Sequence, residues 1–101
     1  MEEYVDLRPA FLVERYLPGL TQDALVALAA SLWNATGQIR RSGSLVSWLG
    51  SAALLEEETM FCVFRAPSRE AVQALNELAL APYERISEVF FVDGKPSCRS
   101  H

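Results

Sequence analysis

The distribution of apolar side chains divides the chain into six short segments. Four of them follow the two-residue period of a strand, in which successive side chains point to opposite faces; these cover residues 11–17, 44–54, 59–66 and 85–94. Two others have apolar residues at the three- and four-residue spacing of an amphipathic helix; these cover residues 22–39 and 69–80. The predicted order is therefore β-α-β-β-α-β.

Turn and capping residues indicate where the predicted elements begin and end. Pro18 and Gly19 form a turn pair that stops the first strand, and Thr21 offers an N-cap hydroxyl to the first helix. Ser68 is placed in the same way before the second helix. The acidic segment 55–59 is short, so we expect it to join the second and third strands as a hairpin.

This order of elements is typical of one fold class. Short connections and right-handed crossovers favour a ferredoxin-like α+β sandwich, in which a four-stranded antiparallel sheet has both helices on one face. We expect a single ferredoxin-like domain over residues 1–101, with its core at about residues 11–92. Residues 93–101 show no periodicity, and we expect this tail to be mobile.

The third predicted strand is apolar on both faces, but the two helices can cover only one face of the sheet. We expect the helices to cover a set of apolar residues from three strands: Phe11, Val13, Phe61, Val63, Val89 and Phe91. The opposite face then contains Leu12, Glu14, Tyr16, Met60, Cys62, Phe64, Glu88 and Phe90. Six of these eight side chains are apolar or aromatic, which predicts that the face is an interface. We therefore expect a homodimer whose two sheets meet, as in dimeric α+β barrels.

Polar side chains within this apolar face are the candidate site. Glu14, Cys62 and Glu88 are the candidate metal ligands, because a carboxylate between two sheets must be paired, protonated or bound to a cation. Two alternatives remain open at this stage. The face assignment can slip by one residue, or Arg15 and Arg85 can neutralise the carboxylates at the rim.

Three aromatic residues are candidates for contact with a small apolar ligand, although packing in the core or the interface also explains them. They are Tyr16, Phe64 and Trp48. Cys62 likewise has alternatives as a small buried hydrophobic residue or as a reactive thiol. The pair Cys98 and His101 supplies two metal ligands, whereas zinc sites need three or four.

Charge and composition restrict the partners. The chain has a net charge of −4 and no cluster of basic residues, which argues against binding to nucleic acid. No apolar run approaches the roughly 20 residues that span a bilayer, so no membrane association is expected. An acidic start and two cysteines without disulfide spacing favour a cytoplasmic location.

Three segments together resemble a known family. They are FLVERYLPGLT, EEETMFCVFRAPSREAV and LAPYERISEV. In combination they are similar to small bacterial ferredoxin-like proteins of a domain-of-unknown-function family that includes a nickel-binding protein. The resemblance implies a ferredoxin-like fold, a homodimer, and binding of nickel or another divalent metal ion. Met60 and Asn76 stand where members often have cysteine and histidine, which bind nickel better than a thioether or an amide.

The chemistry of the residues favours a non-enzymatic binding protein. No Ser-His-Asp set or phosphate-cradling glycine loop occurs, and the single histidine is the last residue of the chain. Acid–base catalysis would therefore rest on a perturbed Glu, Tyr or Cys. The alternatives are a small cofactor-free enzyme, similar to monooxygenases or isomerases with a cavity in a dimeric α+β barrel, and a structural or partner-binding module.

Overall fold

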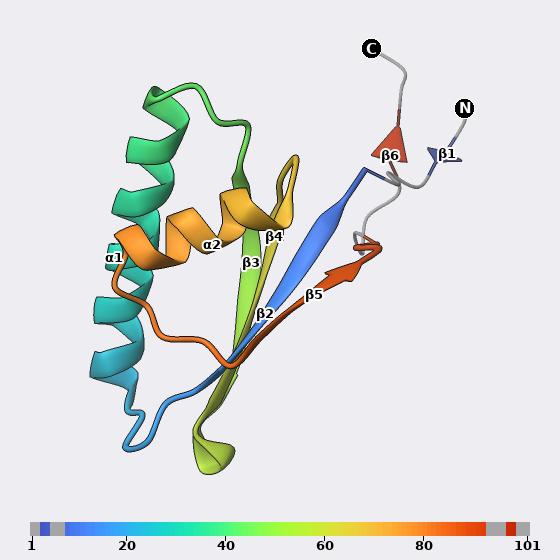
Figure 1. The fold of residues 1–101 in the computed structure, drawn as a ribbon. Helices are drawn as coiled ribbons and strands as arrows, with labels where there is room; N and C mark the ends of the chain where they lie inside the picture. Colours follow the sequence, from blue (N-terminus) through green and yellow to red (C-terminus); the bar gives the residue numbers. More distant parts are fainter. Residues whose placement is uncertain (1–2, 5–7, 93–96, 99–101) are drawn as a thin grey trace.

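The computed structural model describes residues 3–4, 8–92 and 97–98, and it confirms the predicted order of the main elements (Figure 1). The helices and strands are β1 Glu3–Tyr4, β2 Ala10–Tyr16, α1 Gln22–Arg41, β3 Ser47–Leu54, β4 Thr59–Arg65, α2 Arg69–Leu78, β5 Arg85–Val89 and β6 Ser97–Cys98. A single 3₁₀ turn, η1 Leu55–Glu57, joins β3 to β4.

The main sheet has four strands in the order β3-β4-β2-β5, and all its pairs are antiparallel. Both helices lie on the same face of this sheet (Figure 1). The arrangement is the ferredoxin-like α+β sandwich that the sequence predicts. It leaves the second face of the sheet without a helix, and β3 and β5 are the two edge strands.

Both helices begin at the predicted caps. The Thr21 hydroxyl accepts a hydrogen bond from the Ala24 amide at 3.1 Å, and the Ser68 hydroxyl accepts one from the Ala71 amide at 3.2 Å. Each cap satisfies one of the amide groups that a helix start leaves without an intrahelical acceptor. Within the described residues, no helix is both long enough and apolar enough to cross a membrane.

The ends of the elements differ from the prediction by a few residues. Helix α1 continues to Arg41, two residues beyond the predicted end, and stops before Gly43, which has φ +105°. Helix α2 stops at Leu78, because Leu80 adopts a positive φ of 55° that a helix cannot include. Strand β5 ends at Val89, which is earlier than the predicted end.

A second, two-stranded sheet was not predicted. It pairs β1 with β6, with Glu3 opposite Cys98 and Tyr4 opposite Ser97. The predicted mobility of the tail concerns residues 93–101, which lie outside the described residues apart from this strand. His101, which the sequence analysis considered together with Cys98 as two possible metal ligands, also lies outside the described residues.

The register between β2 and β4 corrects the predicted face assignment. Phe11 lies opposite Phe64, and Val13 lies opposite Cys62. Directly opposite residues of an antiparallel pair share a face, so Cys62 and Phe64 lie with Phe11 and Val13 under the helices, where all four are buried. The prediction for β4 is therefore wrong by one residue. Phe61 and the other odd-numbered residues of β4 are on the face without helices.

Because one leucine of α2 is in the core and another is not, we expect their substitution by alanine to cost different amounts of folding free energy. Leu75 is completely buried, whereas Leu78 is 48% exposed. We expect Leu75→Ala to lower the free energy of unfolding by about 2–5 kcal/mol, because it leaves a cavity in the core. Leu78→Ala should cost less than about 1 kcal/mol. Urea unfolding followed by circular dichroism measures both, and equal losses would contradict this packing.

Candidate functional site

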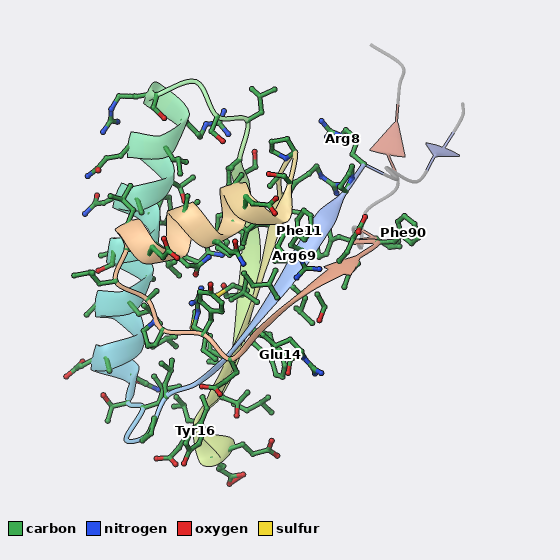
Figure 2. All side chains as sticks on the ribbon, viewed as in Figure 1. Arg8, Phe11, Glu14, Tyr16, Arg69 and Phe90 are labelled. Atoms are coloured by element: carbon green, nitrogen blue, oxygen red, sulfur yellow. The ribbon has the colours of Figure 1, made fainter. Side chains whose placement is uncertain are left out.

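Glu14 lies on the sheet face without helices, in the middle of β2 (Figure 2). Its Cα partners are Phe61 on β4 and Arg85 on β5. The Glu14 Oε2 atom accepts hydrogen bonds from Arg85 Nε at 2.8 Å and from Arg85 Nη2 at 2.6 Å. Neutralisation of Glu14 by Arg85, one of the alternatives left open by the sequence, is therefore confirmed.

The other two candidate metal ligands lie elsewhere. Cys62 is completely buried under the helices. Glu88 is opposite Phe11 and so belongs to the helix-covered face of β5, but it is exposed at the edge of the sheet. The described residues contain no group of three or more His, Cys, Asp or Glu side chains that could hold a metal ion. The structure thus separates Glu14, Cys62 and Glu88, and their roles as ligands stay predictions.

Near Glu88, the start of α2 covers the sheet. The Arg69 guanidinium lies over the Phe11 ring, 5.9 Å from its centroid (Figure 2), and donates a hydrogen bond to the Ile86 carbonyl. Because this cation stacks on a ring and bonds to β5, it holds the helix start against the edge of the sheet. This corner is a packing contact.

The three aromatic candidates form two separate groups. Tyr16 is 52% exposed at the end of β2, and its hydroxyl donates to Glu58 Oε1 at 3.3 Å. Phe64 is buried under the helices, and Trp48 of β3 stacks against it with ring centroids 6.5 Å apart. Trp48 and Phe64 are therefore neighbours, whereas Tyr16 lies on the opposite face of the sheet.

Trp33 of α1 adds a third ring that sequence reasoning did not assign to a site. Its ring meets Trp48 edge to face, with centroids 6.0 Å apart, and it is 73% exposed. The two indoles line a groove of about 500 Å³ between α1 and β3, which also includes Arg40 and Gly50. We call it the tryptophan groove. Two tryptophans on adjacent predicted elements were the available signal, but their contact depends on the packing of α1 against β3.

Arg15 is the second residue whose position sequence reasoning missed. It is 1% exposed, under the helices, and not at the rim, where one of the two open alternatives had it. Its Nη2 atom donates to Asn76 Oδ1 at 2.6 Å, and Nη1 donates to the carbonyls of Pro82 at 3.1 Å and Ala81 at 3.5 Å. Its Nε atom has no hydrogen-bond partner among the residues that the structure describes. The two-residue period from Phe11 was the signal that could have placed it.

Asn76 is completely buried, and both the oxygen and the nitrogen of its side-chain amide form hydrogen bonds. Its Oδ1 atom accepts from Arg15, and its Nδ2 atom donates to the Val72 carbonyl at 2.7 Å. The resemblance places a histidine at this position in many family members. Here the side chain is an acceptor for a guanidinium, and a cation next to it would repel a metal ion. Arg15 and Asn76 therefore do not form a nickel site, and the described part of one chain contains no cluster of three or more metal-binding side chains.

Arg15 and Asn76 should behave as one unit in stability measurements. We expect Asn76→Ala to lower the free energy of unfolding by about 2–4 kcal/mol, because it removes the side-chain acceptor from a buried guanidinium. The loss in the double variant Arg15→Met/Asn76→Ala should be smaller than the sum of the two single losses by about 1–3 kcal/mol. Denaturation of all four proteins of the cycle measures this coupling. Strict additivity would show that the hydrogen bond is energetically unimportant.

Comparisons with known proteins agree with the geometry of the fold. The crystal structure of SCO4226 from Streptomyces coelicolor A3(2) superposes with a TM-score of 0.69 at 24% identity, covering 83% of this chain and 99% of that chain. At this identity the match shows the fold alone. Comparison with curated proteins gave no significant match. Residues 11–89 match the family model described as nickel responsive protein SCO4226-like, and the chain therefore belongs to this family.

Proposed function

We propose that the chain functions as a homodimeric, non-enzymatic binding protein whose two helix-free sheet faces pack against each other. The observation behind this proposal is the composition of that face. Cross-strand register places on it a set of side chains from all four strands of the main sheet: Leu12, Glu14, Tyr16, Ala52, Phe61, Val63, Arg85, Ser87 and Val89. We call this set the open face. Six of these nine side chains are apolar or aromatic, which is unusual for the solvent side of an antiparallel sheet.

The apolar residues of the open face are contiguous. Leu12 lies directly opposite Val63, and Phe61 is the next residue of β4 on the same face. Complete burial of a large apolar side chain contributes roughly 1.5–3 kcal/mol. Because these three side chains are already half-buried in one chain, covering them contributes less than that. A stable dimer therefore requires most of the open face, since association also loses translational and rotational freedom.

The ion pair on the open face is compatible with burial in such an interface. Arg85 donates to one carboxylate oxygen of Glu14 through two nitrogen atoms. A guanidinium and a carboxylate that are already hydrogen-bonded carry no net charge into the interface, whereas a lone carboxylate would lose its hydration without compensation. The pair also gives the apolar face a directional contact that restricts how a second copy can approach.

Binding of a divalent metal is the second part of the proposal, and the family description supports it by naming nickel. Glu14 is the candidate ligand that belongs to the open face, so a second copy could share it. Cys62 is separated from this face by the sheet itself. We therefore propose Glu14, and not Cys62, as the residue through which the inter-sheet space contacts a metal ion, which would replace the Arg85 guanidinium on the Glu14 carboxylate.

The dimer is tested by introducing one negative charge, either on the open face or on the exposed side of α1. We expect the wild-type chain to show twice the monomer mass by light scattering at micromolar concentration. Val63→Glu should be monomeric, because it places a carboxylate among the apolar residues of the open face. Val26→Glu is the matched control, since Val26 is 68% exposed on α1, and it should remain dimeric. A monomeric wild-type chain at tens of micromolar would remove the basis of the proposal.

The metal arm is tested by calorimetric titration of tag-free protein with Ni²⁺. We expect the heat of binding to decrease in Glu14→Gln and to remain unchanged in Cys62→Ala, because the Cys62 thiol is completely buried. Circular dichroism confirms the fold of each variant. Loss of nickel binding in folded Cys62→Ala would refute the assignment, and absence of heat in the wild type would refute metal binding while leaving the dimer in place.

A further inference from the structure

The tryptophan groove lies apart from the open face. It lies between α1 and the edge strand β3, and none of its lining residues belongs to the open face. A ligand in it would therefore not compete with a second copy bound to the open face. Its volume of about 500 Å³ lies within the range of small-molecule sites. The groove can be tested independently of the proposed function.

Trp33 and Trp48 form an aromatic wall of the groove, and one side of this wall is exposed to solvent. Trp48 is half-buried because it stacks on Phe64 and touches Trp33. Trp33 has only this ring contact in the described residues, and 73% of its surface is exposed. An indole with an uncovered face offers a large stacking area to a flat ring. The wall therefore favours a planar aromatic ligand over a branched aliphatic one.

The backbone of β3 leaves space beside this wall. The register between β3 and β4 shifts between Trp48 and Gly50, so the strand bulges at this point. Because β3 is an edge strand, no further strand of the main sheet fills this space in the described residues. A ring in contact with Trp33 can thus extend over the bulge.

Among the described residues that line the groove, one side chain is charged, and it is the cation Arg40. Arg40 Nη1 donates to the Val46 carbonyl at 2.9 Å and to the Ser47 hydroxyl at 3.0 Å, which holds the guanidinium in place. Its Nε and Nη2 atoms form no hydrogen bond with other described residues. These atoms form one edge of the planar guanidinium, and two donors along one edge match the two oxygens of a carboxylate.

From these features we propose that the tryptophan groove binds a planar aromatic carboxylate. The ring lies against Trp33 and Trp48, and the carboxylate accepts hydrogen bonds from Arg40. Charge complementarity supports an anion, because the described residues that line the groove of this acidic chain include no Asp or Glu. The ligand must be small, because its ring has to contact the two adjacent indoles while its carboxylate contacts the Arg40 guanidinium.

Nuclear magnetic resonance can test the proposal directly, because the chain contains only two tryptophans and therefore two indole N–H signals. The probes are 2-naphthoate, its neutral amide 2-naphthamide, and cyclohexanecarboxylate, which has the anion without the aromatic ring. We expect 2-naphthoate to shift both indole signals with submillimolar affinity. The amide and the non-aromatic acid should each bind at least tenfold more weakly. No shift with 2-naphthoate at 5 mM, or equal binding of the amide, would overturn the proposal.

Variants then locate the site. Arg40→Gln should weaken 2-naphthoate binding at least tenfold, whereas Arg41→Gln, which alters the other arginine of the same helix turn, should not change it. Trp33→Ala should abolish binding and, because this side chain is exposed, should leave the amide spectrum otherwise unchanged. Unaltered affinity in Arg40→Gln or in Trp33→Ala would overturn the site.

Two further measurements separate this proposal from its alternatives. Leu12→Glu, which places a carboxylate on the open face of β2, should retain the affinity for 2-naphthoate even if it is monomeric, because β4 separates β2 from the groove strand β3. The mass of Trp33→Ala in light scattering should equal that of the wild type. A change in that mass would identify the groove as a contact between copies of the chain and would overturn the small-molecule assignment.

Discussion

Cross-strand pairing between β2 and β4 is the constraint on which the rest of the structure depends. Because Val13 lies opposite Cys62, the thiol belongs to the core, and the neighbouring residues Phe61 and Val63 belong to the open face. A shift of this pairing by one residue would exchange the two sets. The hairpin determines the register through a tight connection, in which the 3₁₀ turn Leu55–Glu57 is followed by Glu58 with a left-handed backbone.

The order of elements and the helix caps could be predicted because they depend on local chemistry. Thr21 and Ser68 cap their helices through their own side chains, so the neighbouring sequence is sufficient to locate them. The buried face of β4 could not be predicted, because both of its faces are apolar and its register depends on a partner strand about 50 residues away. The burial of Arg15 was not predicted because charged residues are rarely buried, although the two-residue period of β2 places it in the core.

The candidate site was the part least accessible to sequence reasoning. The proposed grouping of Glu14, Cys62 and Glu88 assumed a common face, and the pairing of three strands separates them. Trp33 and Trp48 come together only because α1 packs along the edge strand β3, a tertiary contact without a local sequence signal. Membership of the nickel-responsive family was accessible, because it follows from the arrangement of short motifs along most of the chain.

The buried guanidinium of Arg15 also has a consequence for how the domain unfolds. One side chain of the central strand is bonded to α2 through Asn76 and to the connection before β5 through the Ala81 and Pro82 carbonyls. If that connection detached, the cation would remain in apolar surroundings with fewer acceptors. Partial opening at the second half of the domain is therefore unfavourable, and α2, β2 and β5 should lose their structure together in one cooperative step.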